Sequence, residues 1–319
     1  GEAGKLTAGE INDFSKWGLW KDLKRSELIS HKVSSKINPA NRYTVHITDQ
    51  NLLPMADVFV RLKTKEGEVL FQARTDNTGK AELWGSLIDL SNSRESKKVI
   101  EVIHKDVSYL IKRPKQIEEG VNYKMLTTDC NQSQKVDIAF VVDATGSMSD
   151  ELNFLTAEMN DVMYKAKQIS TSLNFSFANV FYRDLGDDYV TKTQDFTRVL
   201  SESVSFVTEQ RAGGGGDFPE AVEVALDTAI NNLSWRQTAR ARIVFLILDA
   251  PPHNTKEIQE KLRRISTQAA EKGIRIVPLV ASGIDKATEY LMRSIALTTN
   301  GTYAFLTGHS GIGNEHIEP

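Results

Sequence analysis

The most constraining feature of this sequence is an almost continuous apolar stretch at residues 136–142 that ends in Asp143. Apolar segments of strand length are typical of strands that are buried on both faces of a parallel sheet. Thr145 and Ser147 follow the aspartate at alternate positions, and open α/β sheets bind ligands at the carboxyl ends of their strands. One carboxylate and two hydroxyls, with water completing the shell, suit a hard divalent cation such as Mg2+. The stretch therefore predicts a parallel sheet with a metal site at one strand end.

Strands and helices alternate between residues 131 and 307. Predicted strands cover residues 136–142, 175–182, 243–248, 274–280 and 303–306, with one more expected before a Gly-rich loop. Helices are expected over residues 148–166, from Pro219-Glu220 onward, over 256–272 and over 285–298. This alternation is typical of a parallel sheet covered by helices. We therefore expect one doubly wound α/β domain over residues 131–307, with a mostly parallel, six-stranded sheet.

Residues 41–127 have a different pattern, in which short stretches of alternating apolar and polar residues are separated by turn signals. Tyr43, Val45 and Ile47, for example, alternate with polar neighbours. The pattern predicts a small antiparallel β-sandwich before the α/β domain. Residues 49–83 also resemble the transthyretin-like, carboxypeptidase-regulatory type of module, which implies a spacer or binding role.

The two ends of the chain carry weaker signals. Residues 1–40 are polar except for an amphipathic piece in which Phe14, Trp17 and Trp20 are spaced for a few turns of helix. We expect a helical or extended segment docked on one of the domains; the alternative is an aromatic motif that binds a partner. Residues 308–319 are expected to form a loose C-terminal tail rather than to supply metal ligands.

The pattern Asp143-x-Thr145-x-Ser147 resembles the metal-ion-dependent adhesion site of von Willebrand factor A (vWA) domains. In that family a later strand-ending aspartate contributes a carboxylate to the metal, usually through water. Asp249, which ends the predicted strand at residues 243–248, stands at this place. The resemblance implies a metal site of Asp143, Thr145, Ser147 and Asp249, with Mg2+ as the expected ion and Mn2+ or Ca2+ as alternatives.

A Gly-rich loop, Gly213-Gly214-Gly215-Gly216-Asp217, completes the resemblance. Integrin-like A domains present a threonine in this loop, and its slot is taken here by Gly216. Because glycine has no side-chain oxygen, the metal would be bound more weakly, or Asp217 or a water molecule would fill the gap. The form Gly-Gly-Gly-Asp-x-Pro-Glu resembles the variant A domains of many bacterial proteins and of alpha-kinases that carry an A domain. We expect a variant site in a protein of bacterial type.

Arg183 and Asp184 begin a charged segment after the second predicted strand. Such a segment is normally a solvated loop. The alternative is that either side chain supports the site loops, since variant A domains have a similar sequence here.

The overall composition narrows the function. A net charge of -3 argues against a general nucleic-acid binder, and no apolar stretch approaches the roughly 20 residues that cross a bilayer. The single cysteine, Cys130, fits a cytosolic protein and an envelope protein without disulfides equally well. Residue 1 is Gly rather than Met, so a signal peptide could have been removed. A periplasmic or surface location is favoured over a cytoplasmic one.

Two alternatives compete with a metal site. In one, Thr145 or Ser147 caps the helix that starts near Met148, and no metal is present. In the other, Asp143 is a phosphoryl-accepting nucleophile, but haloacid-dehalogenase-type phosphatases need a second Asp where this chain has Thr145. The chain has neither a phosphate-binding P-loop nor a Gly-x-Ser-x-Gly elbow. We therefore expect a protein that is not an enzyme.

The sequence thus predicts a recognition or adhesion module whose divalent ion binds an Asp or Glu of a partner protein. The alternative function is a cytosolic scaffold or regulatory subunit that works with an ATPase, as A domains of the chelatase type do. A metal-dependent phosphatase or other hydrolase is less favoured.

Overall fold

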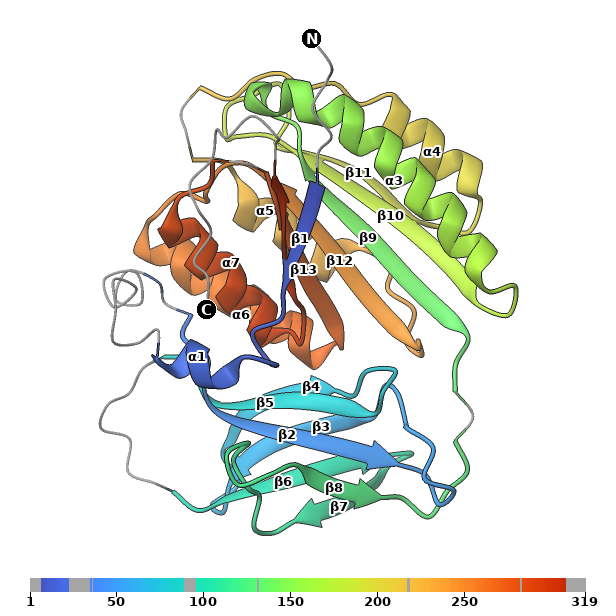
Figure 1. Cartoon of the computed structure of the whole chain (residues 1–319), viewed down its shortest axis with the longest axis vertical. Helices are drawn as coiled ribbons and strands as arrows, with labels where there is room; N and C mark the ends of the chain where they lie inside the picture. Colours follow the sequence, from blue (N-terminus) through green and yellow to red (C-terminus); the bar gives the residue numbers. More distant parts are fainter. Residues whose placement is uncertain are drawn as a thin grey trace.

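The computed structural model describes residues 7–22, 35, 37–88, 96–130, 132–216, 219–281 and 283–307. Figure 1 shows a large sheet flanked by helices, which we call the α/β unit, and below it a smaller part made of two β-sheets, which we call the β module. None of the helices in these ranges is both long and apolar enough to span a membrane.

The sheet of the α/β unit has seven strands. In order across the sheet they are β1 (Thr7–Ile11), β14 (Tyr303–Thr307), β13 (Ile274–Val280), β12 (Ala241–Leu248), β9 (Lys135–Asp143), β10 (Asn174–Tyr182) and β11 (Thr191–Thr197). The five central strands are parallel, and the edge strands β1 and β11 are antiparallel to their neighbours. The predicted mostly parallel α/β sheet is confirmed. The predicted strand number is wrong by one, because β1 joins from the N-terminal segment.

Helices cover both faces of this sheet (Figure 1). The helices are α3 (Ser149–Ile169) and α4 (Leu200–Thr208) on one face, and α5 (Val222–Asp227), α6 (Lys256–Glu271) and α7 (Lys286–Thr298) on the other. A 3-10 turn (Gly146–Met148) precedes α3, and a π-helical turn (Thr228–Asn232) follows α5. α6 is capped by Thr255, and Gly273 follows it in the left-handed conformation, with φ +69°, as predicted for a helix end.

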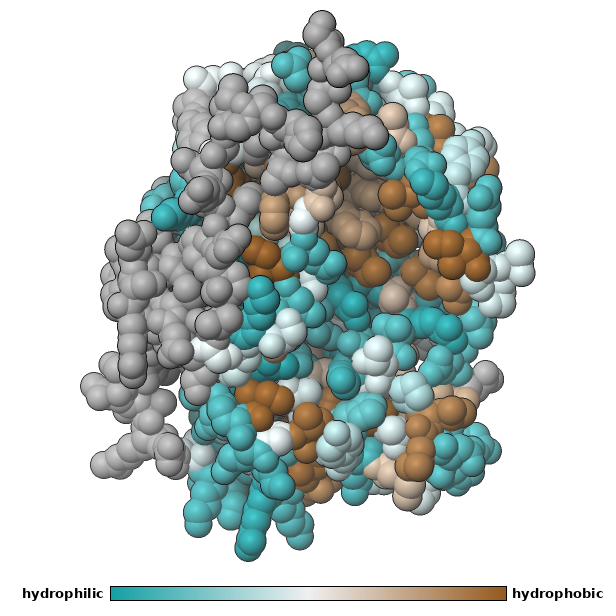
Figure 2. All heavy atoms as spheres, viewed as in Figure 1, coloured by the Kyte–Doolittle hydropathy of each residue, from teal (hydrophilic) through white to brown (hydrophobic). Residues whose placement is uncertain are grey.

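The face that carries α3 is only partly covered by this helix. Phe245 and Leu279 pack against the same apolar cluster as the buried side of α3 but stay half-buried. Figure 2 shows apolar side chains gathered on the molecular surface beside α3.

Within residues 7–22, the described part of the N-terminal segment, lie the strand β1 and the short helix α1 (Trp17–Asp22). Of the three aromatic residues spaced for a helix, Trp17 and Trp20 lie in α1 and Phe14 precedes it. Residues 7–11 pair with β14, and Gly9 lies directly against the ring of Phe305. The segment is docked as expected: Trp17 packs on Trp84 of the β module, and Trp20 stacks on Tyr290 of α7 with ring centroids 5.4 Å apart.

The β module contains a three-stranded and a four-stranded sheet that share one apolar cluster. The strands are β2 (Ala40–Thr48), β5 (Lys80–Ser86) and β8 (Asn122–Met125) in the first sheet, and β3 (Phe59–Thr64), β4 (Val69–Arg74), β6 (Lys98–His104) and β7 (Val107–Ile111) in the second. The prediction of a purely antiparallel module is wrong for β2 and β8, which are parallel. β8 reaches β2 through a long connection from the other sheet, so hairpin geometry does not fix its direction. The transthyretin-like resemblance and the domain boundaries stay predictions, and residues 308–319 lie outside the described residues.

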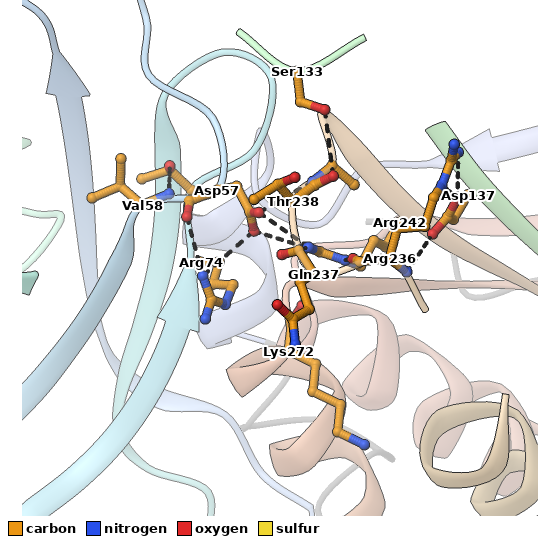
Figure 3. A network of polar contacts seen from close by, with 12 residues as sticks. Asp57, Val58, Arg74, Ser133, Asp137, Arg236, Gln237, Thr238, Arg242 and Lys272 are labelled. Carbon is orange, nitrogen blue, oxygen red and sulfur yellow. Dashed lines mark hydrogen bonds and ion pairs between the residues drawn. The ribbon is translucent and has the colours of Figure 1, made fainter. Parts of the chain in front are cut away.

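A network of ion pairs and hydrogen bonds joins the β module to the α/β unit (Figure 3). Asp57, just before β3, pairs with Arg242 of β12 through two contacts of 2.7 and 3.0 Å. The Arg242 guanidinium also donates to the backbone carbonyls of Arg236, Gln237 and Lys272. These contacts lie at the amino ends of the parallel strands, the end of the sheet opposite Asp143.

Candidate metal centre

The candidate site lies at the carboxyl ends of the two central strands of the sheet. Asp143 is the last residue of β9, and Asp249 follows β12 directly. The chain leaves β9 through α3 on one face, and it reaches β12 through α5 on the other face. Ligands of open α/β sheets bind at such a switch point. The fold therefore brings together the two predicted carboxylates.

Asp143 is fully buried and organises the turn that follows it. Its Oδ1 atom accepts hydrogen bonds from the backbone N–H of Thr145 at 2.9 Å and from the Thr145 hydroxyl at 2.6 Å. The hydroxyls of Thr145 and Ser147 are 3.2 Å apart. Thr145 therefore orients the carboxylate, and neither the 3-10 turn nor α3 receives a side-chain cap bond. The capping alternative is not what the described residues adopt.

Carboxylate oxygens without hydrogen bonds mark this site. Oδ2 of Asp143 and Oδ1 of Asp249 are buried and have no partner in the described part of the chain. Burial raises the pKa of Asp143 to about 7, and the nearby charge of Asp249 adds to the rise, although the Thr145 hydrogen bonds act in the opposite direction. Both observations indicate a place where negative charge lacks a counter-ion.

The Gly-rich loop packs against the start of the metal motif. The N–H of Gly213 donates to the carbonyl of Ala144 at 3.0 Å, and the N–H of Gly146 donates to the carbonyl of Gly214 at 3.1 Å. Gly214 and Gly215 have φ values of +74° and +77°, which only glycine adopts without strain. A Cβ on Gly214 would lie 2.5 Å from the carboxyl group of Asp187. The glycines are therefore needed for the shape of this loop.

Gly216, by contrast, is exposed, and a Cβ there would meet no atom within 4 Å. The space that a threonine side chain would need is thus open. Asp217, the proposed substitute for the missing hydroxyl, lies outside the described residues.

Arg183 and Asp184 lie beside the two site loops. Arg183 donates to the carbonyls of Ala144 and Arg211 at 3.2 and 2.9 Å, so it contacts the loop after β9 and the start of the glycine loop. Asp184 is buried, and its Oδ1 lies 2.9 Å from Nε2 of His253, four residues after Asp249. These are contacts of buried groups rather than of a solvated loop. The supporting role of the two residues stays a prediction.

Glu220 is a buried carboxylate beside the candidate site that the sequence interpretation did not single out. Only 3% of it is exposed, and its Oε2 has no hydrogen-bond partner among the described residues. Its backbone N–H donates to the carbonyl of Pro251 at 2.9 Å, which places it beside the loop after β12. The sequence interpretation had Pro219-Glu220 open a helix, but α5 begins at Val222. A glutamate next to a proline carries no sequence signal beyond a helix start.

The residues present fit a divalent cation bound partly through water. In the described ranges no three His, Cys, Asp or Glu side chains come close enough to enclose an ion by themselves. Two hydroxyls and two carboxylates with unpartnered oxygens are nevertheless the hard oxygen ligands that Mg2+ prefers. An ion here would need Thr145, Ser147 and water in addition to the carboxylates.

Two curated proteins resemble this chain over part of their length. An alpha-protein kinase, vwkA of Dictyostelium discoideum, is 33% identical over 148 residues, which are 45% of this chain and 23% of the kinase. A putative ariadne-like RING finger protein, R811 of Acanthamoeba polyphaga mimivirus, is 33% identical over 129 residues, which are 40% of this chain and 12% of that protein. The chain thus matches less than a quarter of either relative.

These names contradict the prediction that the chain is not an enzyme. One relative is named as a kinase and the other as a RING finger protein, so the exclusion of an enzyme does not stand. The prediction was wrong because it rested only on the absence of familiar catalytic motifs from this chain. The predicted bacterial type is not confirmed either.

Solved structures are also similar to part of this chain, at low sequence identity and low TM-score. The conserved hypothetical protein BatB from Bacteroides thetaiotaomicron is 15% identical, with 54% of this chain and 91% of that chain covered and a TM-score of 0.39. Proximal thread matrix protein 1 from the mussel byssus, described with a zinc occupied MIDAS motif, is 18% identical, with coverages of 53% and 41% and a TM-score of 0.40.

The family comparison covers the α/β unit from β9 onward. A sequence model described as von Willebrand factor A domain matches residues 137–314, which is more than half of the chain. The match begins in the strand that ends in Asp143 and includes β12 and Asp249. The chain belongs to the von Willebrand factor A domain family.

Proposed function

We propose that the α/β unit recognises a partner protein through a divalent cation. Asp143, Thr145, Ser147 and Asp249 would hold the ion, with Mg2+ as the proposed species and Mn2+ or Ca2+ as alternatives. When bound, the ion supplies a positive charge with an open coordination position for an Asp or Glu side chain of the partner. The glycine loop shapes one wall of the site.

The observation that carries this proposal is the burial of carboxylate oxygens without partners. Oδ2 of Asp143 and Oδ1 of Asp249 accept no hydrogen bond in the described part of the chain. An unsatisfied buried acceptor costs about 1–3 kcal/mol, and more when it is charged. A cation that contacts both groups would offset this cost, and the Thr145 and Ser147 hydroxyls lie beside them.

Calorimetric titration of chelator-treated protein with Mg2+, Mn2+ and Ca2+ tests the proposal. We expect saturable binding of at least one ion by the wild type, and loss of that binding in Asp143→Ala, whose circular dichroism spectrum should stay unchanged. A column of immobilised protein should then retain Asp- or Glu-containing peptides with the ion and release them with chelator. A variant that binds the ion and these peptides as well as the wild type would refute the proposal.

A second candidate function follows from the names of the relatives. We infer that the chain serves as the recognition part of a larger enzyme, because one partial relative is an alpha-protein kinase. The cytosolic scaffold or regulatory subunit that works with a separate ATPase stays an alternative proposal. Sequencing the transcript outward from both ends of the chain tests the idea. A kinase or RING segment in the same reading frame supports it, and stop codons that closely flank the chain count against it.

A further inference from the structure

A groove of about 900 Å³ lies at the end of the large sheet opposite Asp143. The last turn of α3, the starts of β9 and β10, and the chain between β11 and α4 form its wall. Among the described residues the wall contains four cations and no carboxylate; the cations are Lys135, Lys167, Arg198 and Arg236. This composition distinguishes the groove from the acidic candidate metal centre at the other end of the sheet.

Three of the four cations have no carboxylate partner in the described part of the chain. Arg236 is the exception, because its guanidinium is held by the buried Asp137 at 2.6 Å (Figure 3). The ammonium group of Lys167 donates to the backbone carbonyl of Arg198 at 3.0 Å, which leaves its charge uncancelled. Lys135 and Arg198 are exposed. The groove therefore carries the positive charges of three side chains.

Acidic residues beside the groove are already engaged by its wall. Asp195 accepts hydrogen bonds from the backbone N–H and the hydroxyl of Ser234, at 2.9 and 2.6 Å. Glu202 accepts a hydrogen bond from the hydroxyl of Thr197 at 2.6 Å. Ser234 and Thr197 line the groove, whereas the two carboxylates do not. The space that a ligand would enter is thus left with cations and hydroxyls, which favours a negatively charged ligand.

Apolar side chains line the same groove. Val199 is 51% exposed, and Leu173 and Phe196 are half-buried. The ring of Phe196 is held by the indole of Trp235, with ring centroids 4.6 Å apart in an edge-on arrangement. A small anion such as inorganic phosphate would leave these side chains in contact with water. A peptide with both acidic and apolar side chains would cover both parts of the wall, as protein interfaces commonly do.

We propose that this groove binds an acidic peptide segment of a partner protein that also has a large apolar side chain. Glu or Asp side chains of the segment would pair with Lys135, Lys167 and Arg198, and the apolar side chain would pack on Leu173 and Val199. The length of β9 separates the groove from the candidate metal centre. The inference therefore goes beyond the proposed metal-dependent function and does not require the ion.

Fluorescence anisotropy with a short labelled peptide that contains glutamate and phenylalanine tests the proposal. Every titration contains chelator, so that the candidate metal centre contributes nothing. We expect saturable binding by the wild type and about tenfold weaker binding by the double variant Lys135→Gln, Arg198→Gln, because two charge pairs at an exposed site are lost. Added salt should weaken binding by the wild type.

Lys165→Gln is the matched control. Lys165 lies close to Lys167 in α3, but it pairs with Asp161 at 2.5 Å and does not line the groove. The control should bind the peptide within about twofold of the wild type. All three proteins should have the same circular dichroism spectrum, because the replaced side chains are exposed. Equal binding by the double variant and the control would overturn the inference.

Comparison ligands test the kind of partner. A peptide with lysine in place of glutamate should not bind, and one with alanine in place of phenylalanine should bind more weakly than the first peptide. Equal binding of the alanine peptide would overturn the assignment of the apolar wall. A short DNA duplex that binds while the acidic peptide does not would overturn the whole inference.

The failure of this inference is distinguishable from failure of the proposed function. An acidic peptide that binds only with Mg2+, and not to Asp143→Ala, occupies the candidate metal centre; this result would overturn the groove and support the proposed function. A wild type that binds the peptide in chelator but binds no ion would support the groove and overturn the proposed function.

Discussion

Replacing Asp57 with Asn should destabilise the whole protein, although Asp57 lies far from the candidate metal centre. Asp57 is held by the Arg242 guanidinium through contacts of 2.7 and 3.0 Å, and the Arg242 side chain is only 5% exposed. Asn has nearly the same volume, and it tolerates the positive φ of +63° that Asp57 adopts. The substitution therefore removes charge with little change of shape (Figure 3).

The expected magnitude follows from the burial of the partner that remains. Removing one member of a buried ion pair costs about 3–5 kcal/mol, because the other charge stays desolvated. Arg242 keeps its three bonds to backbone carbonyls, so we expect the low end, about 3 kcal/mol. At about 2.1 cal/mol/K per residue, the entropy of unfolding of this 319-residue chain is about 0.7 kcal/mol/K, so the melting temperature should fall by roughly 4–5 °C.

Differential scanning calorimetry measures this effect, with Asp161→Asn as the control. Asp161 pairs with Lys165 on the exposed side of α3, with side chains 46% and 68% exposed. This surface substitution should change the melting temperature by less than about 2 °C. We also expect one transition for the wild type and two for Asp57→Asn, as the β module and the α/β unit uncouple. Equal, small shifts in both variants would refute the reasoning.

Four further predictions concern the metal site and the N-terminal segment. Ion affinity should increase between about pH 6 and pH 8, because protons compete for the carboxyl group of Asp143, whose pKa is raised to about 7; titrations that give one Kd across this range would contradict it. This raised pKa, and that of the neighbouring Glu220 at about 8, mean that the folded protein without metal binds protons that the unfolded chain has released. Its stability in chelator should therefore decrease as the pH rises from about 4 to 8, which urea unfolding measures. Gly214→Ala should lower both the melting temperature and the ion affinity, because the φ of Gly214 is +74° and the new Cβ would meet Asp187. Gly216→Ala should change neither quantity. Similar effects of the two substitutions would count against this loop geometry. Asp13→Ala should lower the free energy of unfolding, measured with urea, by about 3–5 kcal/mol, because it removes one of two carboxylates from the buried guanidinium of Arg293. A decrease below about 1 kcal/mol would argue that the N-terminal segment is not anchored at Arg293.

The central part of the fold could be predicted from the sequence because its signals are local. The apolar stretch that forms β9, the Asp at its end and the left-handed Gly273 after α6 each depend on neighbouring residues. The strand β1 could not be predicted, because it pairs with β14 nearly 300 residues further along the chain. The parallel pairing of β8 with β2 is non-local in the same way.

In the candidate site, too, the residues that depend on local signals could be predicted and the others could not. Asp143 and Asp249 end apolar strands, so their placement at one sheet edge follows from parallel topology. Glu220 was not singled out because its burial beside the site depends on contacts with Pro251 and Pro252, which are more than 30 residues further along the chain.

The position of β1 also determines how the β module is attached. The chain contributes β1 to the edge of the large sheet, leaves to build the module, and returns as β9 in the middle of the same sheet (Figure 1). The module is thus an insertion with two covalent tethers. A domain on a single linker is attached at one point, whereas this one is attached to two strands of the same sheet. A mechanical load on the module would therefore be shared between the two tethers, one of which continues into β9, the strand whose far end carries Asp143.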